Sequence, residues 1–174
     1  MTPSAVQLIF HAVRFARLEF KEASQIAYGG EEGPPFPPEK ELVKAQLVVE
    51  LMDNYHYHPD VIRVNALVAL QSAPLRYIEA DVLVEASGHK PFLLFGVEAP
   101  HLYEEKQEGN LRKLFEIAAA FPADSLPAYL VYYTRRYDQG NFSRQFKTID
   151  FRIYPAFSAW HKAGCPVQDA IPSG

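Results

Sequence analysis

Two acids that interrupt a pair of apolar segments are the residues best placed for chemistry. The first segment, residues 75–85, contains Asp81, and the second, residues 92–97, is followed directly by Glu98. The second segment is apolar throughout, which is typical of a strand covered on both faces. A carboxylate beside such a strand is costly unless it faces a cation or hydrogen-bond donors. Asp81 and Glu98 therefore predict a polar site beside a buried strand.

The elements that position these acids begin with a hairpin. The short polar connection between the two segments contains Ser87-Gly88, which indicates a β-hairpin. Residues 61–70 predict a strand before the hairpin. We expect the strands 61–70, 77–85 and 92–97 to be consecutive and antiparallel.

Two helices are expected to cover this sheet. Residues 38–54 form the clearest predicted helix, because Pro38 suits a first helical position and Glu41 lies in the first turn, where the helix dipole favours an acid. Residues 110–121 carry the apolar stripe of a second helix. A helix between the strands 92–97 and 129–134 makes a βαβ crossover, so those two strands should be parallel. The fold class predicted is α/β.

The hairpin resembles the core of PD-(D/E)XK nucleases, in which an Asp on one strand and an acid-x-Lys triplet on the next face a divalent metal. More narrowly, residues 38–134 resemble the N-terminal nuclease domain of type I restriction enzyme R subunits. The match rests on the acidic first helix, on Asp81, and on an apolar strand that ends in Glu98-Ala99-Pro100. The resemblance implies a restriction-endonuclease-like mixed sheet flanked by helices. It also implies one domain over residues 1–174, with family-specific extensions at 1–37 and 135–174.

The resemblance assigns Asp81 and Glu98 as catalytic residues, and Glu41, Asp81 and Glu98 as ligands of Mg²⁺. Glu79 would be a further oxygen donor, and Glu85 a solvated charge at the end of the hairpin. The family's lysine is missing in either alignment, because Glu98 or Pro100 occupies its position. Asn110 stands loosely where the family has a glutamine.

Two hypotheses follow from this departure. In the first, the chain is a Mg²⁺-dependent endodeoxyribonuclease that cleaves slowly, and the pair Gly96→Glu with Glu98→Lys would restore activity. In the second, it is a catalytically degenerate nuclease-fold module that serves as a binding or structural protein.

One basic and aromatic concentration stands outside this core. Residues 132–152 interleave tyrosines and phenylalanines with the candidate nucleic-acid-binding residues Arg135, Arg136, Arg144 and Lys147. Such mixtures bind nucleic-acid strands. The alternative, which we favour, is a late β-hairpin that turns near Gly140 and is charged to protect a sheet edge. Residues 151–153 predict a further short strand.

Composition bounds these interpretations. The chain has 174 residues, 48% of them hydrophobic, a net charge of −4 and one cysteine. Because phosphate neutralisation drives DNA affinity, the acidic charge predicts weak DNA binding by the chain alone. The resemblance to type I restriction R subunits implies restriction-modification subunits, or further copies of the chain, as partners that would hold it on DNA. The apolar stretches are too short to predict a membrane partner, and we expect a cytoplasmic protein.

Overall fold

The computed structural model describes residues 18–21, 25–28, 39–70, 75–86, 90–138 and 141–173. Most of the expected N-terminal extension, residues 1–37, lies outside this described part. Within the extension, β1 (Leu18–Lys21) pairs antiparallel with β2 (Gln25–Tyr28).

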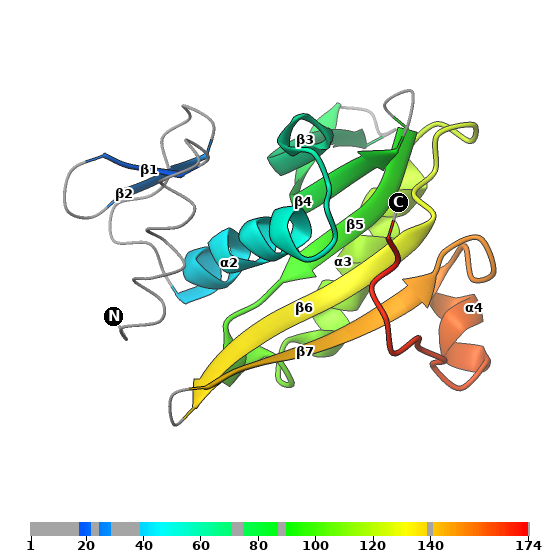
Figure 1. Ribbon diagram of the computed structural model, residues 1–174. Coiled ribbons are helices and arrows are strands. Elements are labelled where there is room, and N and C mark those ends of the chain that lie inside the picture. The colour runs from blue at the N-terminus through cyan, green and yellow to red at the C-terminus, as the bar shows by residue number, and fades with distance from the viewer. Residues whose placement is uncertain are drawn as a thin grey trace.

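A five-stranded mixed sheet forms the centre of the fold, with the strand order β3-β4-β5-β6-β7 (Figure 1). The strands are β3 (Ile62–Leu70), β4 (Arg76–Ala86), β5 (Lys90–Val97), β6 (Tyr129–Asp138) and β7 (Asn141–Asp150). β3, β4 and β5 are antiparallel neighbours, β6 runs parallel to β5, and β7 returns antiparallel to β6. The predicted hairpin, the parallel crossover and the late hairpin are therefore confirmed. The apolar strand β5 lies at the middle of the sheet, as its composition predicted.

Helices cover both faces of this sheet. The helix α2 (Glu39–Asp53) packs on one face, and α3 (Gln107–Ala120) lies behind the sheet in the view of Figure 1. α3 begins three residues before the predicted helix. A short helix, α4 (Phe157–Lys162), packs against α3 through Phe157 and Trp160. The predicted α/β class, with a mixed sheet between helices, is confirmed.

The two faces of the sheet carry separate hydrophobic cores. On the α2 side, Val82, Phe95 and Val131 are buried together with the helix. On the α3 side, Leu94, Leu114 and Tyr132 occupy the equivalent layer. Residues alternate between the two cores along β5 and β6, as strand geometry requires.

Two local predictions are wrong. Residues 151–153 form a turn rather than a strand, because Asp150 accepts backbone N–H groups from Arg152, Ile153 and Tyr154 and so closes the chain on itself. Glu85 is buried rather than solvated, since the guanidinium of Arg63 on the neighbouring strand binds it, with Nε 2.6 Å from Oε1.

Within the described residues, no helix is long and apolar enough to cross a membrane.

Candidate functional site: a carboxylate–lysine cluster

An irregularity where β3 faces β4 positions Asp81. Asn65 has a positive φ of 55°, a left-handed conformation that asparagine tolerates better than most residues. It lies between the paired positions Val64–Val82 and Ala66–Ala80, opposite Asp81. Val82 packs in the core on the α2 side, whereas Ala80 packs on the α3 side. Asp81 therefore lies at the point where the side chains of β4 switch from one face of the sheet to the other.

The backbone of the next strand holds the carboxylate of Asp81 in place. Asp81 Oδ2 accepts a hydrogen bond from the backbone N–H of Val97 at 2.9 Å. Val97 is the residue before Glu98, so this bond ties the two predicted site acids to each other across β4 and β5. Asp81 is only 9% exposed, and a buried carboxylate needs such donors.

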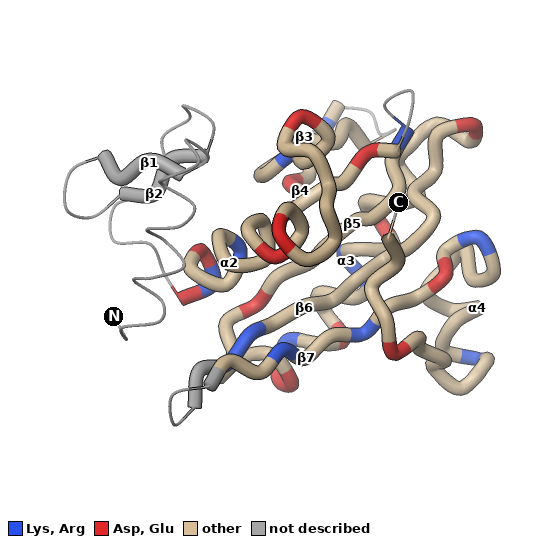
Figure 2. The backbone as a smooth tube through the Cα atoms, in the orientation of Figure 1, with Lys and Arg blue, Asp and Glu red and all other residues tan. Residues whose placement is uncertain are grey.

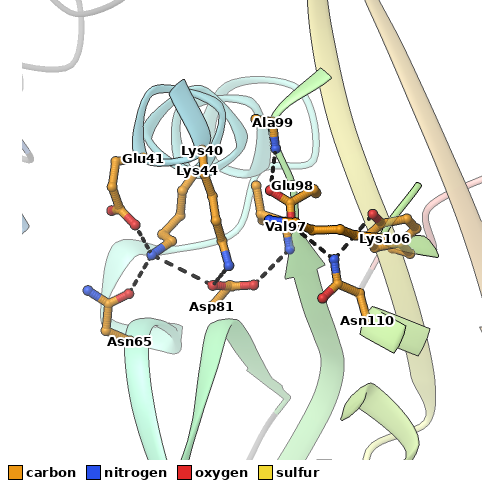
Figure 3. Close-up of polar contacts among 11 residues, drawn as sticks. Lys40, Glu41, Lys44, Asn65, Asp81, Val97, Glu98, Ala99, Lys106 and Asn110 are labelled. Atoms are coloured by element: carbon orange, nitrogen blue, oxygen red, sulfur yellow. Dashed lines mark hydrogen bonds and ion pairs between the residues drawn. The ribbon is translucent and has the colours of Figure 1, made fainter. Parts of the chain in front are cut away.

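Two lysines from α2 approach the other oxygen of Asp81 (Figure 3). Lys40 Nζ lies 2.8 Å from Asp81 Oδ1, and Lys44 Nζ lies 3.8 Å from the same oxygen. The two lysines are four residues apart, a spacing that places both on one face of a helix. They face β4 because the first half of α2 packs against the sheet at this point.

Lys44 is the buried member of this pair. Its side chain is 2% exposed, and its ammonium lies 2.6 Å from Glu41 Oε1 and 2.6 Å from Asn65 Oδ1. A buried ammonium is tolerated only when it is paired and hydrogen-bonded. Asn65 therefore contributes to the site through both its backbone conformation and its side chain.

Lys40 is the more exposed member, with 32% of its side chain accessible. Burial lowers its pKa, but the charge of Asp81, the hydrogen bond to Asp81 and the charges of Glu98 and Glu41 outweigh burial, so the pKa is raised. All three predicted metal ligands thus act on one ammonium group. Lys40 stays protonated throughout the physiological pH range.

Glu98 is held by contacts that Asp81 does not share. Its Oε1 accepts the backbone N–H of Ala99 at 2.9 Å, and its Oε2 accepts Asn110 Nδ2 at 3.1 Å. Lys106 Nζ lies 3.8 Å from the same Oε2. Asn110 thus orients Glu98 from the first half of α3.

A pair of stacked tyrosines, Tyr103 and Tyr132, lies next to Asn110. Asn110 Nδ2 lies 3.3 Å from the hydroxyl of Tyr132, which itself donates to the backbone oxygen of Tyr103 at 2.9 Å. The Tyr103 and Tyr132 rings stack with centroids 4.4 Å apart. Burial, together with the nearby acids, raises the pKa of Tyr132 to about 12, so this hydroxyl remains a donor.

The three predicted acids therefore meet around lysines. Glu41 and Asp81 both contact Lys44, and Asp81 and Glu98 are joined through the backbone of Val97 (Figure 3). Three ammonium groups, those of Lys40, Lys44 and Lys106, face these three carboxylates. The cluster is thus balanced in charge without any other cation.

The donor atoms of the cluster suit a hard divalent cation. Mg²⁺ prefers carboxylate oxygens, and Asp81 and Glu98 offer these with Glu41 close by. Among the described residues, however, no three acidic, His or Cys side chains are arranged to hold a metal. A cation that binds Asp81 Oδ1 would have to displace the ammonium of Lys40. The donor atoms are thus of the kind that Mg²⁺ prefers, whereas their arrangement in this structure holds ammonium groups.

Gly96 packs too closely against α3 to be replaced freely. It is the residue that one alignment places at the family's first acid. A Cβ at this position would lie 3.1 Å from Leu114 Cγ and Cδ1. Leu114 is itself 2% exposed, so it would have to shift within its packed surroundings to admit a side chain at position 96. The double substitution Gly96→Glu with Glu98→Lys stays a prediction, and its first substitution would bring a Cβ against the side chain of Leu114.

The four basic candidates do not form one surface. Arg135 and Arg144 are cross-strand neighbours on the side of the sheet that α2 covers, where both bind Glu50. By strand alternation, Arg136 and Lys147 point to the α3 side. Arg136 there donates to the backbone oxygen of Pro100 at 3.2 Å, close to Glu98. Figure 2 shows these basic positions along β6 and β7.

Sequence reasoning missed Lys40 and Lys44. The resemblance places a lysine next to Glu98 at the end of the apolar strand. Lys40 and Lys44 belong instead to a helix that lies about forty residues before Asp81 in the chain. Their four-residue spacing beside Glu41 was the available signal, because it predicts one cationic helix face. It could not show which strand that face meets.

Neither protein-family models nor curated protein sequences include a match to this chain. The fold and the cluster define the chain as an α/β protein with a central mixed sheet and a carboxylate–lysine site beside β4 and β5.

Proposed function

We propose that this chain is a restriction-endonuclease-like domain, related to type I restriction R subunits, that hydrolyses DNA phosphodiesters with Mg²⁺. The observation that carries the proposal is the contact of Lys40 and Lys44 with Asp81. These helix lysines supply, from another element, the positive charge that the strand position lacks. Asp81 and Glu98 are the ligands in this proposal, and Glu41 acts through Lys44.

The bound metal would polarise a phosphate oxygen and lower the pKa of a water molecule. The protein's own residues prepare this arrangement. Lys44, fixed by Glu41 and Asn65, keeps the carboxylate of Asp81 in place. Asn110 and Lys106 orient Glu98 in the same way. Lys40, once it leaves Asp81, offers a flexible ammonium group to a negatively charged phosphate.

The substrate and partners in this proposal come from the resemblance to type I restriction R subunits, and the charge bears on how DNA would be held. The net charge of −4 predicts weak DNA binding by the chain alone, so restriction-modification subunits or further copies of the chain would hold it on DNA. A protein that acts on DNA together with such subunits would be located in the cytoplasm. Arg136, beside Pro100 and near Glu98, is the basic candidate closest to the cluster.

A second candidate function has its own supporting observation. The three lysines balance the three carboxylates, so the cluster is complete as a structural ion-pair network. A nuclease-fold module that has lost catalysis and serves for binding would keep such a network for stability alone. The two candidates differ in whether a metal can displace Lys40.

Metal titration of a Lys40→Gln variant separates the two candidates. In the nuclease proposal, removing the competing ammonium raises the affinity for Mg²⁺ or Mn²⁺ by up to about fivefold, since a partly exposed ion pair contributes roughly 1 kcal/mol. The same variant cleaves plasmid DNA more slowly, because a positive charge near the phosphate is lost. Calorimetric titration and a plasmid nicking assay measure the two effects.

Asp81→Asn and Lys162→Gln complete this experiment. Asp81→Asn should lose metal binding and cleavage together, whereas Lys162→Gln, exposed on α4, should change neither. Absence of metal binding in the wild type and in Lys40→Gln would reject the nuclease proposal and leave the non-catalytic module. Cleavage that is indifferent to Asp81→Asn would reject the site itself.

A further inference from the structure

A second polar site lies between the C-terminal half of α2 and the hairpin of β6 and β7. It is a hollow of about 500 Å³, within the range of roughly 300–1,000 Å³ that small-molecule sites occupy. Its walls are Glu50, Asn54, Tyr55, Arg135, Phe142 and Arg144. None of these residues belongs to the carboxylate–lysine cluster.

The two arginines of this hollow are paired across neighbouring strands. Arg135 on β6 lies opposite Arg144 on β7, so both side chains point to the same face. Like charges directly opposite each other are destabilising, and an anion between them offsets the repulsion. Glu50, 4% exposed, fills this role by accepting Arg144 Nη1 and Arg135 Nη1. One carboxylate between two guanidinium groups leaves a net positive charge in the hollow.

Glu50 is held by donors from both strands of the hairpin. Its Oε2 also accepts the hydroxyl of Tyr133 at 2.7 Å, so three donors share one carboxylate. Burial, followed by the contact with Glu50, raises the pKa of Tyr133, and this hydroxyl therefore remains a donor. Glu50 thus offsets one of the two guanidinium charges. The guanidinium groups retain further N–H donors.

Arg135 carries one buried donor that no acceptor among the described residues satisfies. A guanidinium group carries five N–H donors, and the contact of Arg135 with Glu50 spans 3.3 Å. Its Nε is buried and has no hydrogen-bond partner among the described residues. A buried donor without an acceptor is costly, so an oxygen-rich ligand that drew the guanidinium toward it would relieve this cost.

Aromatic rings line the same arginines. The Arg135 guanidinium lies over the Phe142 ring at 4.7 Å, and that of Arg144 lies 5.4 Å from Phe146 and 6.0 Å from Tyr55. The Tyr55 hydroxyl also accepts Arg144 Nη1 at 2.8 Å. Arginines with aromatic faces bind phosphate and nucleobase together, because the guanidinium pairs with phosphate oxygens while the rings stack on bases.

We propose that this hollow binds the phosphate of a deoxynucleotide, with Arg135 and Arg144 on the phosphate and Phe142 and Tyr55 against the base. The inference deepens the proposed action on DNA and rests on it. α2 contributes to both sites, since Lys44 faces Asp81 on β4 whereas Glu50 faces Arg135 on β6 and Arg144 on β7. The two sites lie on different flanks of this helix, because six positions correspond to about 240° of helical rotation.

Deoxyadenosine monophosphate is the first probe, with deoxyadenosine and inorganic phosphate as its two halves. By calorimetry, the monophosphate should bind wild-type protein at least tenfold more tightly than deoxyadenosine. Arg144→Gln should lose about ten- to a hundredfold of this affinity, the scale of a lost charged hydrogen bond. Arg112→Gln, an exposed arginine on α3 that pairs with Glu108, should bind like wild type.

A second pair of probes identifies the source of the phosphate. A twelve-nucleotide oligothymidylate with a 5′-phosphate is compared with the same strand carrying a 5′-hydroxyl. Preference for the phosphorylated strand assigns the hollow to terminal phosphates or free nucleotides. If the two strands bind wild-type protein with equal affinity and Arg144→Gln lowers that affinity for both, the hollow binds internal phosphates of a strand. Both outcomes require Arg144.

A readout without any variant covers the case in which Arg144→Gln does not fold. Phenylglyoxal modifies exposed arginines, and Arg144 is 44% exposed, so its modification can be followed by mass spectrometry. Bound deoxyadenosine monophosphate should protect Arg144 and leave Arg112 reactive. Absence of binding by the monophosphate and both strands, or binding without protection of Arg144, would overturn the proposal.

The failure of this site and of the nuclease proposal can be told apart. Asp81→Asn removes the metal site but lies outside the hollow, so it should leave nucleotide affinity unchanged. Nucleotide binding without metal binding would retain the hollow and reject catalysis. Metal-dependent cleavage with no effect of Arg144→Gln on any probe would reject the hollow and retain the nuclease.

Discussion

Gly96→Glu is expected to destabilise the protein severely rather than to add a metal ligand. The new Cβ would lie 3.1 Å from Leu114, and the carboxylate beyond it would enter a small hollow that Asp81 also lines. Overpacking costs about 1–3 kcal/mol, and repulsion from the carboxylate of Asp81 adds to that cost. We expect a loss of at least about 3 kcal/mol in the free energy of unfolding, measured by urea denaturation.

The alanine substitution isolates the steric part of this effect. Gly96→Ala alone should cost about 1–3 kcal/mol, whereas in a Leu114→Ala background the added cost should fall below about 1 kcal/mol. The reason is that Leu114→Ala removes the atoms that the new methyl group meets. Equal costs of Gly96→Ala in both backgrounds would show that the contact with Leu114 does not limit this position.

This packing gives a physical reason for glycine at position 96. A side chain here would compete with α3 for space beside Asp81, so the local structure favours glycine. Positive charge beside Asp81 comes from α2, through Lys40 and Lys44.

Most of the central sheet could be predicted from the sequence because local patterns determine it. The uniformly apolar β5 predicted a central strand, and the Ser87-Gly88 connection predicted its antiparallel partner. The helix between β5 and β6 predicted their parallel arrangement. The turn at Phe151 was missed because its cause, the acceptance of three backbone N–H groups by Asp150, depends on geometry after the strand ends.

The candidate site could be predicted only in part. Asp81 and Glu98 stood out because acids beside a buried strand require partners, and the structure supplies those partners. The partners themselves depend on tertiary packing, which no local pattern encodes. The pairing of Glu85 with Arg63 was missed for the same reason, since it depends on strand register.

Lys44→Met is expected to lower the free energy of unfolding by about 3–5 kcal/mol, the cost of removing one partner from a buried ion pair. Lys44 contacts Glu41, Asn65 and Asp81, and its side chain is 2% exposed. Methionine keeps the volume of the stem but removes the ammonium that both carboxylates share. Lys40→Met, at the more exposed position, should cost no more than about 1 kcal/mol. Urea denaturation of both variants measures the difference.

A second substitution tests whether the uncompensated carboxylates cause this loss. Glu41→Gln in the Lys44→Met background removes one of the two charges, so the double variant should regain part of the stability that Lys44→Met loses. Lys162→Met on exposed α4 should leave stability unchanged and controls for adding a methionine. If Lys44→Met were no more destabilising than Lys40→Met, the division of roles between a structural Lys44 and a displaceable Lys40 would be wrong. If the division holds, α2 carries both the cation that builds the cluster and the cation that a metal must replace.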